Sequence, residues 1–379
     1  MVDLDLQKAF DTVNHKILLG KLKAAGLADS SIKWFDSYLT GRNQVVDVDG
    51  VHSNPRDVTC GVPQGSILGP LLFLVYVNDM VSAVNCKLLL YADDSALMVS
   101  HRDTEVIQEQ LCSELDAVNE WLIDNKLSLH LGKTESVLFG PKRKLAKQSE
   151  LGITCGNTQI TPKSEIKYLG LDIHQSLDGE ITADKVIKKA NSRLKFLQRK
   201  GRFLNVYTKK LLVSAQIQCH YDYACSSWYL GLTKQTKQRL QITQNKIIRN
   251  VLNLSPRSHI GAKEFQEVNW LPVKYRVFQI IVNHMFRILN GKSPTYLQEG
   301  ITRLSKIHSH STRSGALALY KPHMGTHGQK TFLYNGISLW NSLPTSVQSQ
   351  QCKDIFKLEV KKHFFNEIFQ SESAIYVFN

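Results

Sequence analysis

The stretch that decides the fold is LLLYADDSALMVS, residues 88–100. Two β-rich arms, 87–91 and 95–100, flank Asp93 and Asp94, so we expect a hairpin with this acidic pair at its tip. Adjacent carboxylates repel each other, and bridging divalent metal ions relieve that repulsion. Hard oxygen ligands of this kind suit Mg²⁺, with Mn²⁺ as an alternative. For a single acidic pair the ordinary explanation is a solvated turn. The neighbouring segments must therefore decide between such a turn and a metal site.

A second acidic segment opens the chain. Asp5 ends a short apolar start in VDLDLQKAFD, residues 2–11, where we expect a strand beside the hairpin. Two metal ions held about 3.5–4 Å apart activate an attacking hydroxyl and stabilise a departing pyrophosphate. Asp5, Asp93 and Asp94 are therefore the candidate catalytic residues and metal ligands, and this hypothesis requires their carboxylates to converge.

Three further segments follow in order: GVPQGSILGP (61–70), NKLSLHLGKT (125–134) and YLG (168–170). Together with the Y-x-D-D box at 91–94 and the D-L-x-K-A-F-D pattern at 5–11, they resemble the motifs of LINE-type (non-LTR) retrotransposon reverse transcriptases. The resemblance covers 1–173 strongly and continues through YDYACSSW and WLPVKYR, in the segments 221–228 and 270–276. It implies an RNA-directed DNA polymerase with an RNA template, a DNA primer and deoxynucleoside triphosphates.

The implied fold is α+β. Residues 1–173 resemble a polymerase palm, an antiparallel sheet with packed helices, with the fingers absent. Residues 181–290 would form a mainly helical, thumb-like region, and 291–379 a C-terminal region whose fold the sequence leaves open. Expected elements along the chain follow from hydrophobic periodicity and turn residues: helices within 14–40, 65–83, 103–125, 182–199, 207–222, 233–253, 273–290 and 353–369, hairpins within 43–60 and 153–173, a strand at 134–139 and an irregular connection at 300–330.

The resemblance also implies residue roles at the catalytic centre. Asp5, Asp93 and Asp94 would hold the two metals, and the backbone carbonyl of Leu6 would add one oxygen. Lys133 would help pyrophosphate to depart as a cation or general acid. Its alternative is an ordinary surface lysine.

Substrate contacts are implied in the same way. Phe10 would be the steric gate that rejects a 2′-hydroxyl, with a core phenylalanine as the alternative. Gln64 and Gly65 would lie under the template–nucleotide pair, Gly65 because backbone must approach the ligand closely. Tyr91 would contact substrate beside the acidic pair. The primer-grip hairpin would consist of Tyr168, Leu169 and Gly170.

RNA-dependent RNA polymerases are the nearest alternative class. They usually carry Gly before the acidic pair, where this chain has Ala92. They also use a second aspartate to bind the 2′-hydroxyl, a role that Asp11 would suit. Phe10 at the gate position favours the reverse transcriptase instead.

Charge is divided unevenly along the chain. Residues 1–180 carry 17 Lys and Arg against 24 Asp and Glu, whereas residues 181–379 carry 30 against 9. Such a basic half predicts a track for a polyanion, although a basic surface that serves solubility is the alternative. Helical spacing places several cations on one face, where they would bind nucleic-acid phosphates: Lys185, Lys188, Lys189, Arg193, Lys195, Arg199 and Lys200, with Arg202 at the exit.

Other features limit the possibilities. The longest apolar stretch, 67–77, is too short to span a bilayer, so no membrane contact is expected. The seven Cys form no C-x-x-C pair, which fits reduced thiols and an intracellular place, nucleus or cytoplasm. No zinc site is expected, because the spacing of the candidate ligands matches no common finger: Cys219, His220, Cys225, His308 and His310. The oligomeric state is not fixed by the sequence.

In the resembled family a fingers region precedes the first metal motif, and many members also carry an endonuclease. Only four residues precede Asp5 in this sequence. We therefore expect an N-terminally truncated copy, whose own activity the sequence leaves open. The alternative function is a non-catalytic nucleic-acid-binding remnant, which would bind without metal-dependent synthesis.

Overall fold

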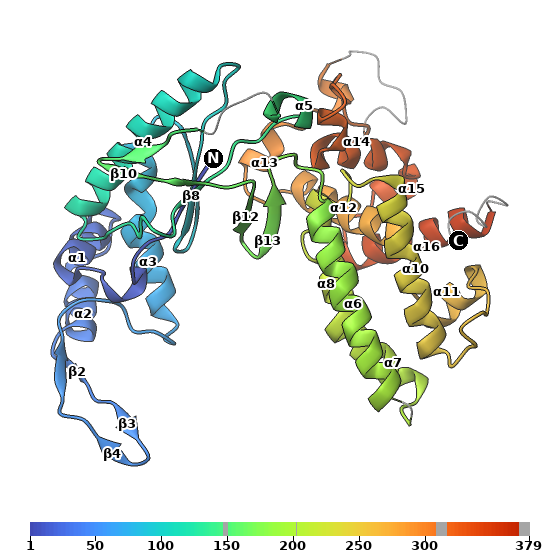
Figure 1. Ribbon diagram of the computed structural model, residues 1–379, viewed down its shortest axis with the longest axis horizontal. Coiled ribbons are helices and arrows are strands. Elements are labelled where there is room, and N and C mark those ends of the chain that lie inside the picture. Colours follow the sequence, from blue (N-terminus) through green and yellow to red (C-terminus); the bar gives the residue numbers. More distant parts are fainter. Residues whose placement is uncertain (147–150, 202, 308–316, 371–379) are drawn as a thin grey trace. The chain divides into compact units, whose positions relative to one another are not determined.

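The computed structural model describes residues 1–146, 151–201, 203–307 and 317–370 (Figure 1). Arg202, His308 and His310, singled out above, lie outside these residues. Contacts divide the chain into two compact units, Met1–Ser176 and Leu177–Asn379. Each unit is described by itself.

A five-stranded sheet organises the first unit. The strand from the N-terminus, β1, lies between the acidic hairpin and a later short strand, and pairs antiparallel with both. The outermost strand β11 is the only one paired in parallel, with β8. In spatial order the strands are β11 (Thr161–Pro162), β8 (Glu135–Ser136), β1 (Val2–Leu4), β7 (Asp94–Met98) and β6 (Lys87–Tyr91).

Helices and small hairpins complete this unit. Asp103 caps the longest helix, because its carboxylate accepts a hydrogen bond from the backbone N–H of Glu105, as the sequence predicted. The helices are α1 (His15–Ala24), α2 (Asp29–Leu39), α3 (Leu68–Val77) continued by the 3₁₀ turn η2 (Asn78–Ala83), α4 (Thr104–Asp124) and α5 (Lys142–Leu145). The paired strands outside the main sheet are β2 (Arg42–Gln44) with β5 (Arg56–Val58), β3 (Asp47–Val48) with β4 (Val51–His52), β9 (Thr154–Cys155) with β10 (Thr158–Gln159), and β12 (Glu165–Tyr168) with β13 (Leu171–His174).

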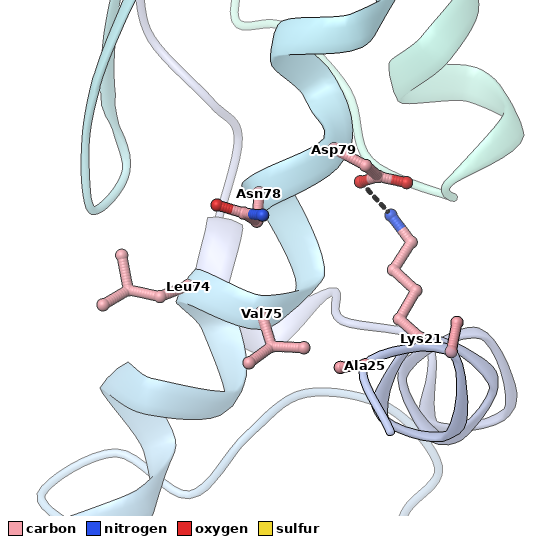
Figure 2. A pocket seen from close by; sticks show the side chains of 7 residues that line it. Lys21, Ala25, Leu74, Val75, Asn78 and Asp79 are labelled. Atoms are coloured by element: carbon pink, nitrogen blue, oxygen red, sulfur yellow. Dashed lines mark hydrogen bonds and ion pairs between the residues drawn. The ribbon is translucent and has the colours of Figure 1, made fainter. Parts of the chain in front are cut away.

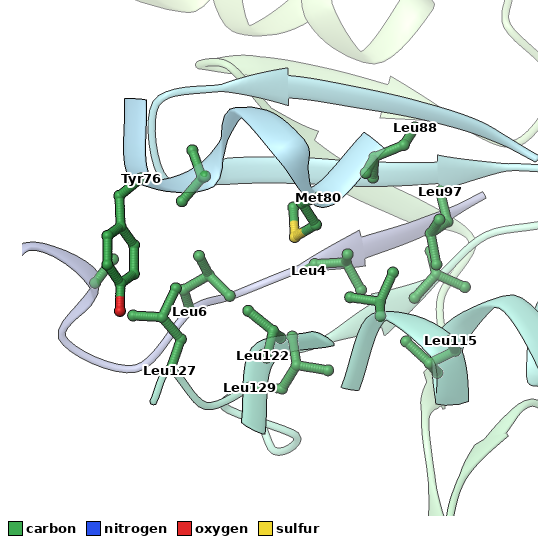
Figure 3. Packing of buried hydrophobic residues seen from close by; sticks show 14 of the residues in the cluster. Leu4, Leu6, Tyr76, Met80, Leu88, Leu97, Leu115, Leu122, Leu127 and Leu129 are labelled. Atoms are coloured by element: carbon green, nitrogen blue, oxygen red, sulfur yellow. The ribbon is translucent and has the colours of Figure 1, made fainter. Parts of the chain in front are cut away.

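One face of the sheet is covered by the main core. Alternation along β1 sends Val2 and Leu4 to this face, and the side chains of α3, η2 and α4 pack against them. Figure 3 shows this packing, with Leu4 and Leu97 of the sheet among the leucines of the helices and loops. A smaller cluster occupies the opposite face, where Met1, Ala96, Val137 and Ile166 are buried together. Asp3, between Val2 and Leu4 on β1, is therefore directed to the second face.

Two local predictions for this unit are wrong. The segment 153–173 contains two hairpins, because Gly156 and the pair Leu169 and Gly170 each provide positive-φ turn residues. The predicted strand 134–139 is reduced to β8, since only its first part pairs with β1. The helices within 14–40 and the hairpins around 50 and 92 are confirmed.

The second unit is helical in its described part. The predicted helix 207–222 is confirmed, with a wider π segment, Ser214–Gln218, between its α-helical parts. The helices α11 and α14 were not predicted from the sequence. The helices are α6 (Glu180–Lys200), α7 (Val206–Val213), α8 (Cys219–Asp222), α9 (Cys225–Trp228), α10 (Lys234–Val251), α11 (Ala262–Val268), α12 (Val273–Leu289), α13 (Tyr296–Glu299), α14 (Phe332–Ser342), α15 (Thr345–Gln348) and α16 (Lys353–Gln370).

Packing within this unit centres on α10 and α12. An apolar stripe of α6 packs against α10, while α14 and α16 pack against α12. Arg276 of α12 forms a bidentate ion pair with Asp222 at the end of α8, with N–O distances of 3.1 and 2.7 Å. Phe286 and Phe356 stack at 4.2 Å between ring centroids and join α12 to α16. Helices from both sides of residue 290 therefore share one core.

The protein is of the α+β class, with a mixed first unit and a helical second unit. In the part of the chain described here, no helix is both long and apolar enough to cross a bilayer.

Candidate active site

Strand register places Asp5 beside the acidic hairpin. In the β1–β7 pair Asp3 faces Ala96 and Leu4 faces Ser95, so one further step along both strands brings Asp5 opposite Asp94. Backbone hydrogen bonds hold this position, because Asp5 O accepts from the N–H of His130 at 2.7 Å. Asp5 and Asp94 thus leave the same sheet edge from neighbouring strands.

The acidic pair lies at a two-residue turn. Tyr91 faces Asp94 across the hairpin, which leaves Ala92 and Asp93 as the turn residues. Ala92 has a φ of 54°, a left-handed conformation that disfavours any residue with a Cβ. Tyr91 is 65% exposed, so its ring is open to a ligand beside the pair.

The pKa shifts of Asp94 and Asp3 indicate that other carboxylates lie near them. Burial raises the pKa of Asp94, and the carboxylates of Asp93 and Asp5 raise it further. Burial likewise raises the pKa of Asp3 to about 6, with contributions from Asp94, Glu135 and Asp5. Burial is the largest cause of each shift, and the neighbouring carboxylates add to it because like charges repel. Asp3 was missed in the sequence, although its two-residue spacing from Asp5 places both on one face of a strand.

The donor chemistry of this cluster fits a hard divalent cation, since every candidate ligand is a carboxylate oxygen. As they stand, however, no three His, Cys, Asp or Glu side chains among the described residues are close enough together to hold a metal ion. The convergence of Asp5, Asp93 and Asp94 around two metals therefore stays a prediction.

Lys133 lies beside the first acid. Its Nζ is 3.8 Å from Oδ2 of Asp5, and both side chains are largely exposed. The loop that carries Lys133 is tied to the first motif by Gln7 N–H, which donates to Ser128 O, and by the bridge between Leu6 and Leu129. Leu6 itself directs its side chain into the main core.

Phe10 is half-buried at the edge of the core. Its ring stacks on Phe73 of α3 with a centroid distance of 4.4 Å and an interplanar angle of 29°. This contact fixes the position of the ring. It is compatible with a steric gate and with an ordinary core phenylalanine. The backbone beside it is also held, because Phe10 O accepts from Val62 N–H.

The segment 61–65 packs closely on the first motif. The side-chain amide of Gln64 donates to Oδ1 of Asp11 at 2.7 Å. Gly61 has a φ of 89°, and a Cβ at this position would lie 2.8 Å from Asp11 O. Gly65 also has positive φ, 76°, but a Cβ there would meet nothing within 4 Å. Gly61, which was not singled out in the sequence, is the glycine that lets this segment approach the backbone of Asp11 closely, whereas the approach of Gly65 to a ligand stays a prediction.

A polar cavity of about 600 Å³ opens beside these residues. It is lined by the first motif, the segment 57–64 and the strand β2, and the cations on its wall include Lys8 and Arg42. The space adjoins Asp11 and Gln64, so it lies next to the predicted nucleotide floor.

A different cavity, of about 420 Å³, lies between α1 and α3 and contains none of the predicted site residues (Figure 2). Lys21 reaches across it to Asp79 at 2.6 Å and to Tyr76 O at 2.7 Å. The Lys21 ammonium also lies 4.6 Å from the centroid of the Trp121 ring. Burial lowers the pKa of Lys21, and Asp79 opposes this shift. These contacts give Lys21 a structural role, in which it links α1 to α3, η2 and α4.

The hairpin β12–β13 faces the acidic cluster. Tyr168 pairs with Leu171, so Leu169 and Gly170 form a turn in which both residues have positive φ. Burial raises the pKa of the Tyr168 hydroxyl, and the charges of Asp3 and Asp94 raise it further. Tyr168 therefore lies on the face of the sheet that bears the carboxylates.

In the second unit, the predicted basic side chains of α6 are exposed. They lie opposite the buried stripe of this helix and comprise Lys188, Lys189, Arg193 and Lys195. Burial lowers the pKa of His220, and the charges of Lys189 and Arg193 lower it further, so positive charge is concentrated beside α8.

Comparison with known proteins finds similarity to reverse transcriptases. Residues 1–173 match the family described as reverse transcriptase (RNA-dependent DNA polymerase). The RNA-directed DNA polymerase from mobile element jockey of Drosophila funebris is 32% identical over 182 residues, covering 46% of this chain and 19% of the relative. Its Drosophila melanogaster counterpart is 26% identical over 262 residues, covering 65% and 28%. A probable RNA-directed DNA polymerase from transposon X-element of Drosophila melanogaster is 28% identical over 258 residues, covering 65% and 27%.

A solved telomerase of Candida tropicalis, in complex with a fragment of telomeric RNA, covers 76% of this chain and 46% of its own. Its TM-score is 0.33 and its identity 15%, a similarity too low to bear on the fold. The chain spans between 19% and 28% of the length of the three relatives above.

The fold and acidic site of residues 1–173, with the family match, define a reverse transcriptase domain. Over part of its length the chain is similar to RNA-directed DNA polymerases of mobile elements, among them those of jockey and the X-element.

Proposed function

We propose that this chain takes part in RNA-directed DNA synthesis by two-metal nucleotidyl transfer. The observation that carries the proposal is the register of β1 with β7, in which the last pair is Leu4 with Ser95, the residues next to Asp5 and Asp94. The raised pKa of Asp94, caused by burial and then by Asp93 and Asp5, supports it, because a bound cation would offset this repulsion.

In the proposed reaction the primer 3′-oxygen attacks the α-phosphorus of a deoxynucleoside triphosphate, and the bond to pyrophosphate breaks. Asp5, Asp93 and Asp94 would hold two Mg²⁺ ions, or Mn²⁺, with the carbonyl of Leu6 as a further donor. Bound there, the metals supply a Lewis acid for the attacking and leaving oxygens. Lys133 would donate a proton to the departing pyrophosphate, or would stabilise it through its positive charge.

The remaining residues would position the substrates. Gln64, held by Asp11, and Gly65 would form the floor beneath the template–nucleotide pair. Phe10, held by Phe73, would exclude a 2′-hydroxyl, and Tyr91 would contact the nucleotide beside the acidic pair. The turn of Tyr168, Leu169 and Gly170 would hold the primer end. An RNA template and a DNA primer are the partners that this arrangement requires.

A second candidate function is nucleic-acid binding without synthesis. The exposed cations of α6 favour it, since phosphate contacts give affinity whatever happens at the acidic site. Lys188, Lys189, Arg193 and Lys195 would make these contacts.

Primer extension on an RNA template with Mg²⁺ separates the two functions. In the full chain, Asp94→Asn should lower extension at least about a hundredfold, because a metal ligand contributes several kcal/mol. The matched control is Asp36→Asn on the exposed surface of α2, which should extend like the parent. Binding of the parent chain to RNA without any extension would support the binding function and overturn the polymerase proposal.

A further inference from the structure

A small cavity in the second unit lies outside the residues that match the reverse transcriptase family. It measures about 200 Å³ and is formed by one face of α12 and the first turns of α16. At roughly 30 Å³ per water molecule in the liquid, this volume admits a small polyatomic group. The lining residues are Ile280, Asn283, His284, Phe286, Arg287, Lys353, Phe356 and Lys357.

The cavity has a rigid apolar floor. Phe286 and Phe356 stack at 4.2 Å with an interplanar angle of 25°, and Trp340 stacks on Phe356 from the other side. A hydrogen bond from the Gln279 amide to Lys357 O, 3.5 Å long, links the two helices again. The basic side chains at the rim are therefore presented from a fixed frame.

The wall of this cavity carries positive charge. Among the described residues its lining includes Arg287, Lys353 and Lys357 but no acidic residue. In the described ranges, none of the ion pairs involves Arg287, Lys353 or Lys357. Burial lowers the pKa of His284, and the nearby charge of Arg287 lowers it further, so this imidazole is mainly neutral at pH 7.

Asn283 adds a polar group to the wall. Its Oδ1 is buried and has no hydrogen-bond partner among the described residues. A half-turn of this amide would direct its NH₂ group, a donor, to the same place. Cationic side chains and a neutral amide thus line one small space above an apolar floor, where their donors would attract an anion.

We propose that this cavity binds a phosphate group of a nucleic-acid strand. Arg287 would contact the phosphate oxygens through its planar fork, and Lys353 and Lys357 would act as point charges. The strand is the expected source, because residues 181–379 carry 30 Lys and Arg against 9 Asp and Glu. The inference rests on the proposed function in that its ligand is nucleic acid, but it does not depend on catalysis.

The test measures how salt weakens binding of the full chain to a fluorescein-labelled single-stranded RNA. Losing one phosphate contact makes the slope of log K against log salt less steep by about 0.7. The double variant Arg287→Gln/Lys357→Gln should show this change. The matched control, Lys246→Gln/Lys263→Gln, removes two exposed cations outside the cavity and should keep the parental slope. Equal slopes for all three proteins, or equal losses in both variants, would overturn the site.

Two further measurements keep the test specific. Asn283→Asp puts a carboxylate into the wall without removing a cation, and should weaken RNA binding in the same direction. Inorganic phosphate should raise the Tm of the parent chain but not of the double variant, whose far-UV circular dichroism checks folding. Phosphate protection with an unchanged RNA slope would show that free phosphate is the ligand, against the strand assignment. A further outcome is that Lys189→Gln/Arg193→Gln on α6 flattens the slope while Arg287→Gln/Lys357→Gln does not. In that outcome the chain binds nucleic acid through α6, and the inference about the cavity fails.

Discussion

Nζ of Lys133 lies 3.8 Å from Oδ2 of Asp5, although 128 positions separate the two residues in the sequence. The pair is held by backbone rather than by its own attraction, since His130 N–H donates to Asp5 O and Lys133 N–H donates to His130 O. The Lys133 ammonium therefore lies beside Asp5, the first acid of the site, and offsets part of its negative charge.

Lys133→Met should lower nucleotide addition by about 10²- to 10⁴-fold if the lysine acts as a general acid. Its effect on the free energy of unfolding should stay below about 1 kcal/mol, because the ion pair is exposed. Single-turnover extension and urea denaturation measure the two quantities. Lys126→Met, at an exposed lysine of the same loop, is the control. Full extension activity in Lys133→Met would show that Lys133 is an ordinary surface lysine without a role in catalysis.

Phe10→Val should admit ribonucleotides. Removing the ring opens space for a 2′-hydroxyl, and a pocket change of this size alters discrimination by about 10- to 200-fold. Incorporation of each ribonucleotide is compared with that of its deoxynucleotide. Phe73→Leu removes the stacking partner but keeps the ring of Phe10, so it separates loss of packing from loss of the gate. Unchanged discrimination in active Phe10→Val would leave only the core role.

Gly61→Ala should destabilise the first unit more than Gly65→Ala does. Both positions have positive φ, which costs about 1–2 kcal/mol for a residue with a Cβ. Only at Gly61 would the new Cβ also collide with the backbone of Asp11, at 2.8 Å from its oxygen. Denaturation midpoints give the comparison. Equal losses would mean that the 61–65 segment yields easily, contrary to the packing described.

Asp222→Ala should destabilise the second unit by more than about 1 kcal/mol, approaching the 3 kcal/mol expected when a buried ion pair loses one partner. The Arg276–Asp222 pair is bidentate and mostly shielded. Asp184→Ala breaks the exposed Arg239–Asp184 pair and should cost less than about 1 kcal/mol. Guanidinium denaturation of both variants provides the measurement. A similar loss in each would show that shielding adds nothing at Asp222.

Cys352 should react with iodoacetamide faster than Cys60 or Cys219, which are also exposed. Hydrogen bonds from the backbone N–H groups of Ile355 and Asp354 lower the pKa of the Cys352 thiol below 9.0, so more thiolate is present at pH 7. The difference should vanish at higher pH, where every exposed thiol is ionised. Mass-spectrometric labelling rates follow the three sites, with Cys352→Ser as the control. Equal rates at pH 7 would contradict the assignment.

Much of the first unit was predictable because its signals are local. The acidic hairpin follows from β-rich arms around two turn residues, and the long helix follows from hydrophobic spacing with Asp103 as its cap. The acidic pair and Asp5 were visible as residue types in an ordered set of motifs. In the second unit α11 was missed because its seven residues give little periodicity to detect, and α14 was missed although it is as long as α2.

The sequence by itself determined the family, the order of the motifs and the acidic character of the site, since these depend on residue types along the chain. Only the tertiary structure decided which residues meet. It placed Asp3 among the carboxylates, Gly61 against Asp11, Lys133 beside Asp5, and both Arg287 and Lys357 on the wall of one cavity. Such contacts join segments far apart in the chain, and they depend on strand register and helix packing, which the whole fold sets together.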